Sequence, residues 1–145
     1  MTTLAESEAD QSTPTWAVGD RLPPLEIGRI TRTDLALFAG GSGDHNPIHL
    51  DLDVARAAGL EDVFAQGMLS MAYLGRLLTD HVVQSRLRSL STRFVATTPV
   101  GAEPTCHAEV VAIDGDVVTL SLEVVLGDGT VSLAGQATVS VEGTA

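Results

Sequence analysis

The sequence predicts a single α+β domain in which an antiparallel β-sheet covers one buried helix. The chain has 145 residues, the size of one ordinary domain with a core of its own. Residues 1–15 are small, polar and acidic and predict a disordered tail, which leaves 16–145 as the domain. The segment 67–84 carries apolar residues around most of its circumference, as a helix buried on most sides does. After it the hydrophobic pattern has a period of two, which is typical of strands with one buried face.

The elements before the buried helix follow from local signals. Residues 19–30 predict an edge strand, since the two prolines within them cannot donate hydrogen bonds to a neighbouring strand. Thr31 with Asp34 three residues later resembles a capping box and predicts a helix that ends at the glycine pair 40–41. Residues 42–51 are expected to be irregular, because a glycine and a proline interrupt them.

A short helix is expected over 52–58, and the buried helix then extends over about 67–84. Strands with tight turns between them are expected at 89–98, 104–114, 117–126 and 130–141. A sheet that covers a helix apolar on nearly every side must curl around it, which is the outline of a hotdog fold. A generic α+β sandwich with the helix on one face is the alternative. A curled sheet leaves an edge or a face open, so a dimer is expected.

The charge of the chain excludes one class of function and leaves one cluster to explain. The net charge is −11 and every basic residue is arginine, so the basic footprint of a nucleic-acid-binding protein is absent. Arg86, Arg88 and Arg93 form the densest basic cluster in the sequence. They are candidates for contact with phosphate groups, and a solvated charged face is the alternative.

Other features favour a cytoplasmic protein without a cofactor. No apolar run reaches the roughly 18 residues that a membrane-spanning helix needs. The first residues do not resemble a secretory signal. The single cysteine, Cys106, forbids an internal disulfide and cannot build a cysteine-based metal site. We therefore expect no metal and no cofactor, and the reducing cytoplasm as the compartment.

The segment 42–51 holds the candidate catalytic residues. Asp44 and His49 are five residues apart, and Pro47 between them forces a bend that can bring a carboxylate and an imidazole to one site. Asn46 can fix that bend by hydrogen bonds to the backbone. Such a pair can exchange protons near neutral pH. The alternative is that Asp44 only forms a turn and His49 lies on the surface. His45 and His49 have the spacing of metal ligands on a helix, but Pro47 interrupts that helix.

Gly67 is the second candidate feature. It stands at the predicted start of the buried helix, where a backbone N–H points outward at the positive end of the helix dipole. Without a side chain in the way, this amide can hold an oxygen atom that develops negative charge. The alternative is that the glycine only permits close packing.

Taken together these residues resemble a known family. The run FAGGSGDHNPIH at 38–49, followed by Ala55, is similar to the hydratase 2 motif of MaoC-like dehydratases and (R)-specific enoyl-CoA hydratases. The resemblance extends from Trp16 to the last strand and includes Gly67. The layout is particularly similar to the catalytic subunit of mycobacterial-type (3R)-hydroxyacyl-ACP dehydratases. The resemblance favours the hotdog fold over the generic sandwich.

The resemblance implies reversible addition of water to a trans-2-enoyl-CoA or enoyl-ACP through the (3R)-hydroxyacyl isomer. Asp44 and His49 would hold the catalytic water, and the backbone N–H of Gly67 would hold the thioester oxygen. Asn46 and Pro47 would orient the loop. Which member of the acid–base pair takes the proton stays open. A non-catalytic acyl-thioester-binding partner subunit is the alternative function. A thioesterase is disfavoured, because the buried helix carries no acid near its start.

Two positions depart from the family pattern. Gly75 stands where some hydratases have a serine that supports the aspartate, and Gln66 stands where many relatives have histidine. Candidates for the acyl pocket are apolar or small residues near the buried helix, with ordinary core packing as the alternative: Phe38, Phe64, Met71, Tyr73 and Gly75. The expected partners are an acyl-CoA or acyl-ACP substrate and a second copy of the chain, or a second hotdog subunit in a heterodimer. No nucleic acid or membrane partner is expected.

Overall fold

The structure is a computed structural model that describes residues 15–141. The tail predicted over 1–15 lies outside the described residues except for its last position. In chain order the elements are β1 (Leu25–Glu26), α1 (Arg32–Ser42), the 3₁₀ turn η1 (Pro47–His49), α2 (Leu52–Ala57), α3 (Gly67–Thr79), the 3₁₀ turn η2 (Gln84–Arg86), β2 (Leu87–Phe94), β3 (Thr105–Asp114), β4 (Val117–Val125) and β5 (Val131–Ser140).

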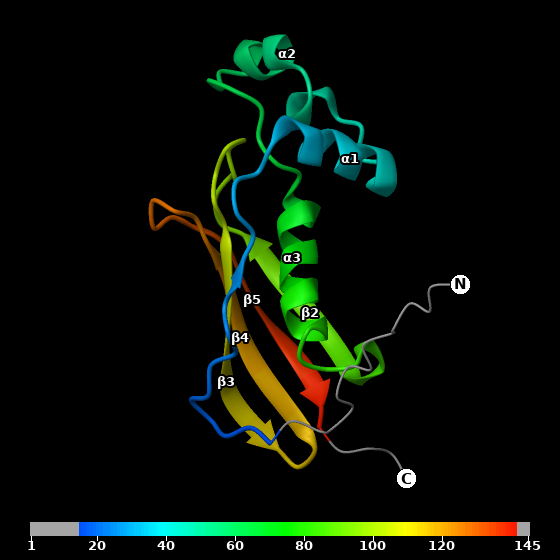
Figure 1. Ribbon diagram of the computed structural model, residues 1–145, viewed down its shortest axis with the longest axis vertical. Coiled ribbons are helices and arrows are strands. Elements are labelled where there is room, and N and C mark those ends of the chain that lie inside the picture. Colours follow the sequence, from blue (N-terminus) through cyan, green and yellow to red (C-terminus); the bar gives the residue numbers. More distant parts are fainter. Residues whose placement is uncertain (1–14, 142–145) are drawn as a thin grey trace, which may run out of the picture.

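One antiparallel sheet carries the fold. Its strand order is β1-β3-β4-β5-β2, and every neighbouring pair is antiparallel. Helix α3 lies along one face of the sheet against β2, β3 and β4, while α1 and α2 lie together beyond one end (Figure 1). The predicted antiparallel sheet with one packed helix is therefore confirmed. No helix in the part of the chain that the structure describes is long and apolar enough to cross a membrane.

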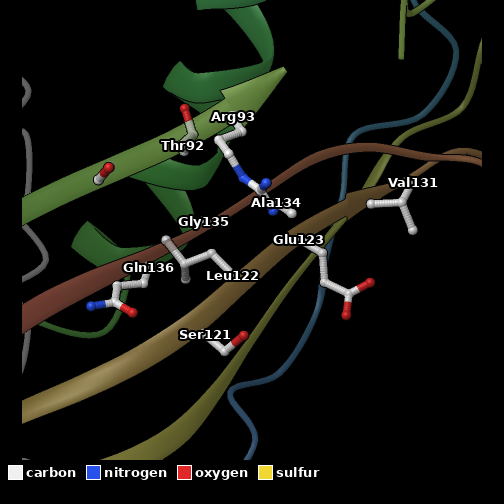
Figure 2. A pocket seen from close by; sticks show the side chains of 10 residues that line it. Thr92, Arg93, Ser121, Leu122, Glu123, Val131, Ala134, Gly135 and Gln136 are labelled. Atoms are coloured by element: carbon white, nitrogen blue, oxygen red, sulfur yellow. The ribbon is translucent and has the colours of Figure 1, made fainter. Parts of the chain in front are cut away.

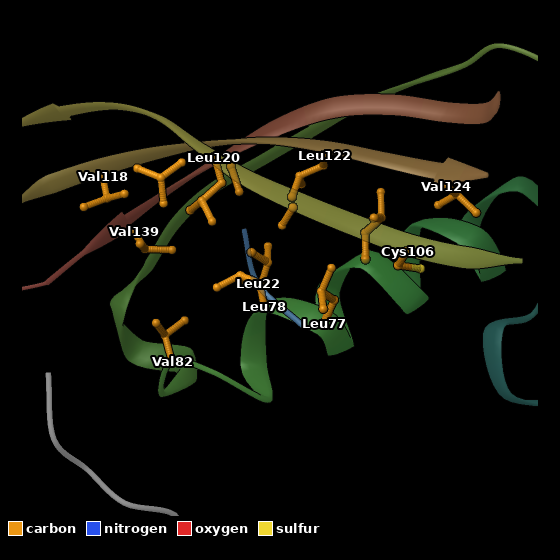
Figure 3. Close-up of a cluster of buried hydrophobic side chains, with 14 of the residues drawn as sticks. Leu22, Leu77, Leu78, Val82, Cys106, Val118, Leu120, Leu122, Val124 and Val139 are labelled. Atoms are coloured by element: carbon orange, nitrogen blue, oxygen red, sulfur yellow. The ribbon is translucent and has the colours of Figure 1, made fainter. Parts of the chain in front are cut away.

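The core lies between α3 and the inner face of the sheet (Figure 3). The period of two in β4 places Val118, Leu120, Leu122 and Val124 on this face, each at most 1% exposed. They pack with α3 side chains in the same cluster, which includes Leu74, Leu77 and Leu78. Full burial of one such side chain contributes roughly 1.5–3 kcal/mol. This cluster therefore holds the helix on the sheet.

The close approach of β2 and β5 depends on a glycine. A Cβ atom at Gly135 would lie 2.1 Å from the carbonyl oxygen of Ser91 and 2.8 Å from the Cα atom of Thr92. Both contacts are with backbone, which cannot rotate away. Gly135 therefore lets these two strands pair at their observed distance.

Helix α1 begins as predicted and ends later. The Thr31 hydroxyl accepts a hydrogen bond from the Asp34 N–H, and the Asp34 carboxylate accepts one from the Thr31 N–H. The hydrogen bonds that the Thr31 N–H and the Thr31 hydroxyl donate to the Asp34 carboxylate lower the pKa of Asp34 from its ordinary value. The glycine pair at 40–41 lies inside the helix, so the predicted end was wrong. The helix ends at Gly43, which has the left-handed conformation with φ of 79°.

Two other boundaries were also wrong. The edge strand expected over 19–30 is reduced to the two residues of β1 and one isolated bridge between Arg21 and Glu109. The prolines that precede β1 have no N–H group to extend the ladder. Strand β2 covers Leu87–Phe94 instead of 89–98, because the chain then turns away and Thr98 accepts a hydrogen bond from Ala65 instead of from β5.

Helix α3 is shorter than predicted and is not buried all round. It ends at Thr79, five residues before the expected end at 84. Val82 lies beyond the helix and is still only 4% exposed, so its apolar character reflects burial and not helical conformation. Met68 and Ala72 lie on an exposed face of the helix. The sheet therefore covers one side of α3 within this chain.

Candidate active site

The loop after α1 is held by its own side chains. The Ser42 hydroxyl donates to the carbonyl oxygen of Phe38 at 2.6 Å and accepts from the Asp44 N–H at 3.1 Å. Asn46 donates its N–H to Asp44 Oδ1 at 3.3 Å, and its side chain accepts from the Ile48 N–H at 3.1 Å. These short-range bonds fix the direction in which the Asp44 carboxylate points.

The segment expected to be irregular contains the 3₁₀ turn η1, with Pro47 at its first position. This turn directs His49 inward, where the residue is only 7% exposed. Its Nδ1 atom lies 2.7 Å from the carbonyl oxygen of Phe64. The Phe64 ring packs edge to face against the imidazole, with 4.8 Å between the two ring centroids. Its Nε2 atom lies 3.8 Å from Asp44 Oδ2. The structure thus brings the acid and the imidazole to one place.

The start of α3 lies beside this pair. Gln66 is the N-cap residue and makes no side-chain hydrogen bond to the helix start, so the first amides of α3 are open to a ligand. Instead Gln66 Nε2 donates to the carbonyl oxygen of Leu35 at 3.0 Å, which ties α1 to the start of α3. Gly67 is exposed, and a Cβ atom there would lie 2.8 Å from the Phe94 ring. The aromatic ring therefore lies directly over the glycine.

One cleft of about 450 Å³ connects these groups. Its lining is mainly apolar and consists of Asp44, Phe64, Ala65, Gly67, Met68, Ser70, Phe94, Val95, Ala96, Thr97, Thr98 and Leu133. His49 is not among the lining residues, but its Nε2 atom lies 3.8 Å from Oδ2 of Asp44, which does line the cleft. The Asp44 carboxylate and the start of α3 share this cleft, and an imidazole nitrogen lies 3.8 Å from that carboxylate. Proton transfer beside a developing oxyanion requires such a set of groups.

Several predicted pocket residues lie elsewhere. Of the acyl-pocket candidates, Phe64 lines the cleft, whereas Phe38, Met71 and Tyr73 pack against the hydrophobic clusters as ordinary core residues. Burial raises the pKa of the Tyr73 hydroxyl. A Cβ atom at Gly75 would meet only Leu90, at 3.9 Å, so there is space beside this glycine, and its role in the acyl pocket stays a prediction. The packing of Phe38, Met71 and Tyr73 favours the alternative of core packing, and their contact with an acyl chain stays a prediction.

The structure does not bring the three predicted phosphate-binding arginines together. Arg86 donates from Nη1 to the carbonyl oxygen of Val141 at 2.8 Å. Arg93 lies near the other end of β2 and points to the outer face of the sheet, where it lines a hollow with Glu123 (Figure 2). Arg86 and Arg93 are close in sequence but lie apart, because an extended strand advances about 3.3 Å per residue and its side chains alternate between the two faces of the sheet. Arg86 and Arg93 therefore do not share one site, and contact of these arginines with phosphate groups stays a prediction.

Two buried polar residues of the cleft were not among the predicted site residues. Ser70 is 1% exposed and Thr98 is 4% exposed, and both line the cleft. One feature of the sequence indicates that Ser70 belongs to the cleft: Ser70 follows Gly67 by three residues, and residues so spaced share a helix face. No group of three or more histidine, cysteine or acidic residues within the described part of the chain could hold a metal ion.

The five-stranded antiparallel sheet and its packed helix define a hotdog-fold domain, and Asp44 and His49 lie close together beside the start of that helix. Residues 20–132 match the model of the MaoC like domain, and the chain belongs to this family. The predicted family is therefore confirmed.

Three known proteins show how far the similarity extends. The 3-hydroxyacyl-thioester dehydratase Z of Mycobacterium tuberculosis strain H37Rv is 30% identical over 97% of this chain and 88% of its own length. The structure of an (R)-hydratase from A. caviae, described as involved in PHA biosynthesis, has a TM-score of 0.78 at 27% identity and covers 88% of this chain and 98% of that one. The ChsH1-ChsH2 complex from Mycobacterium tuberculosis has a TM-score of 0.80 at 22% identity, over 88% of this chain and 100% of that one, and supports the fold alone.

Proposed function

We propose that the protein is an (R)-specific 2-enoyl-thioester hydratase that also acts in reverse as a (3R)-hydroxyacyl-thioester dehydratase. The observation that carries this proposal is the placement of Asp44 and His49 beside the open start of α3 at Gly67. Hydration of an enoyl thioester needs a proton-transfer pair near C3 and a donor at the thioester oxygen. The two relatives named above as a dehydratase and an (R)-hydratase support the same chemistry.

In the forward direction a water molecule lies between Asp44 and His49, and the thioester oxygen accepts a hydrogen bond from the Gly67 N–H. The water oxygen bonds to C3 and loses one proton to the acid–base pair. The electron pair of the C2–C3 double bond moves toward C2 and the thioester oxygen, which gains negative charge. The pair then returns a proton to C2, so that one molecule of water has been added and the protein is unchanged.

The geometry favours His49 Nε2 as the atom that accepts the proton. A carbonyl oxygen can only accept a hydrogen bond, so the short contact with Phe64 requires the proton of neutral His49 on Nδ1. Nε2 then carries a lone pair. Its distance of 3.8 Å from Asp44 Oδ2 exceeds a direct hydrogen bond and leaves room for an oxygen atom that contacts both groups.

A stereochemical assay tests the reaction. The purified protein is mixed with crotonyl-CoA, and loss of the enone absorbance reports hydration. In the reverse direction (3R)-hydroxybutyryl-CoA should regain that absorbance and the (3S) isomer should not. Activity with the (3S) isomer alone, or no activity with any enoyl-CoA or enoyl-ACP, would overturn the proposal. The same assay with longer acyl chains on both carriers identifies the preferred substrate.

The non-catalytic partner subunit is the less favoured function, because Asp44, His49 and the glycine at the helix start are all present and assembled. If the chain is inactive alone and forms an active complex with a second hotdog subunit whether or not it carries Asp44→Asn, this alternative is supported. If a partner restores activity, Asp44→Asn in this chain should abolish it.

We infer that the protein works as a dimer with a second copy of itself. Strand β2 ends the sheet order, so one of its edges is open within the described part of the chain. Beside the cleft, Met68, Phe94 and Val95 are 55%, 58% and 56% exposed, which is unusual for large apolar side chains. A second subunit on this side would cover both features. Light scattering should give twice the chain mass of 15.1 kDa, and a monomer mass would contradict the inference.

A further inference from the structure

The cleft contains a hydroxyl group that has no hydrogen-bond partner. Ser70 is 1% exposed, lines the cleft, and its Oγ atom makes no hydrogen bond to any described residue. Buried polar groups nearly always have a partner, so an unpaired one beside a candidate active site points to a partner that arrives with the substrate. A serine within a helix often bonds to the backbone four residues earlier, but Ser70 does not do so.

The direction of the helix aims this hydroxyl at the start of α3. Side chains of an α-helix tilt toward its N-terminus, and residues three apart share a face. Ser70 therefore lies on the same face as Gly67, roughly 4.5 Å along the axis, and its Cα–Cβ bond leans back toward Gly67. Most of the lining is apolar, and Ser70 Oγ makes no hydrogen bond to the polar lining residues Thr97 and Thr98. Ser70 and Gly67 thus present their donors to the same part of the cleft.

We propose that the Ser70 hydroxyl is a second hydrogen-bond donor to the thioester oxygen of the substrate, beside the N–H of Gly67. This inference rests on the proposed function. A carbonyl oxygen has two lone pairs and can accept both bonds. Its negative charge grows as water adds to C3, so a second donor stabilises the enolate-like state more than the bound substrate. In an apolar cleft such a bond is stronger than in water.

The other unpaired buried atom nearby is Gln66 Oε1, four residues before Ser70 on the same helix. It provides the competing explanation. A hydrogen bond between the Ser70 hydroxyl and Gln66 Oε1 would occupy the donor and give Ser70 a purely structural role. In that case removal of the hydroxyl would lower the melting temperature and leave the reaction rate unchanged.

Kinetics separate the two roles. Ser70→Ala should lower kcat for crotonyl-CoA hydration on the order of a hundredfold, as the loss of an oxyanion donor does, with little change in KM. Ser70→Thr keeps the hydroxyl and should recover most of the rate. The control is Ser132→Ala, which removes a buried hydroxyl that bonds to the Val124 carbonyl oxygen at 3.4 Å and lies outside the cleft lining. Its kcat should match the wild type.

A spectroscopic readout tests contact with the substrate directly. Crotonyl-CoA labelled with ¹³C at the carbonyl is bound to Asp44→Asn, in which turnover should be slowed at least about a hundredfold. The C=O stretch of the bound substrate is then measured by difference infrared spectroscopy. Adding Ser70→Ala should raise the stretching frequency, because the carbonyl loses a donor. An unchanged frequency, or an unchanged kcat in an active enzyme, overturns this inference alone. A wild-type protein without hydratase activity would overturn the proposed function and this inference with it.

Discussion

The Nδ1 atom of His49 lies 2.7 Å from the backbone carbonyl oxygen of Phe64. This contact connects the catalytic loop to the segment that leads into α3, since Gly67 follows Phe64 by three residues. It also selects one form of the neutral imidazole, with the proton on Nδ1 and the lone pair on Nε2. The same bond therefore orients the ring and leaves Nε2 with a lone pair on the side of Asp44, as the proposed proton transfer from water requires.

The first prediction concerns this pair. Asp44→Asn and His49→Gln should each lower kcat for crotonyl-CoA hydration by at least about a hundredfold, the usual contribution of acid–base catalysis. The matched control is His45→Gln, because His45 is an exposed imidazole on the same loop. It should keep the wild-type rate. Wild-type rates in Asp44→Asn or in His49→Gln would remove that residue from the mechanism.

The second prediction concerns the glycine at the start of α3. In Gly67→Ala the new methyl group would lie 2.8 Å from the Phe94 ring, which must move. The ring belongs to a flexible side chain, so the fold should survive while kcat falls by roughly tenfold or more through a displaced oxyanion donor. The double variant Gly67→Ala/Phe94→Leu should recover part of the loss. Equal rates in the single and double variants would show that the ring is not the obstacle.

Gly75→Ala is the control for this prediction, since it makes the same change on the same helix. Its methyl group would lie 3.9 Å from Leu90, an ordinary van der Waals distance. Helical alanine is favoured over glycine by about 1 kcal/mol, so the variant should melt at a higher temperature with an unchanged rate. An altered chain-length preference would instead revive the idea that Gly75 shapes the acyl pocket.

Short-range signals predicted much of this architecture. The alternation in β4 and β5 and the glycine turns placed both strands to within about one residue of their observed ends. The capping pair at Thr31 and the bend at Pro47 are also local, and both occur in the structure. Such features depend on residues a few positions apart, so a single sequence contains the necessary information.

Features that depend on packing between distant segments were not predictable in this way. Met71 and Tyr73 are apolar or aromatic as pocket residues often are, but the rotation of α3 on the sheet packs them, partly buried, against the core cluster. Arg86 and Arg93 are seven residues apart, and only the pairing of β2 shows that Arg93 lies on the outer face. The unpaired hydroxyl of Ser70 becomes notable only once its surroundings are known.

The third prediction concerns the pairing of β2 with β5. Gly135→Ala places a methyl group 2.1 Å from the Ser91 carbonyl oxygen, a clash with backbone that must push the strands apart. Such overpacking costs about 3 kcal/mol or more of the free energy of unfolding. Denaturant unfolding should show a lower midpoint for this variant.

Gly40→Ala is the control for the strand clash, because Gly40 lies in α1 and a Cβ atom there meets nothing within 4 Å. It should stabilise the protein by about 0.5–1 kcal/mol. A Gly135→Ala protein as stable as Gly40→Ala would contradict the close approach of the two strands.

The fourth prediction concerns Cys106, a buried thiol of β3 that is 0% exposed. Burial raises its pKa to about 12 from an ordinary value of 9.0, because the thiolate would lack solvation in the core. The native protein should therefore resist thiol reagents at pH 8 and react fully once unfolded.

The buried thiol also makes the stability depend on pH. The unfolded chain loses the thiol proton above pH 9 and the native chain does not, so this contribution to stability is complete below pH 9 and lost between pH 9 and about 12. Cys106→Ala should show a smaller alkaline decline in unfolding free energy than the wild type. Parallel declines in the two proteins, or rapid labelling of the native thiol, would contradict the burial of this residue.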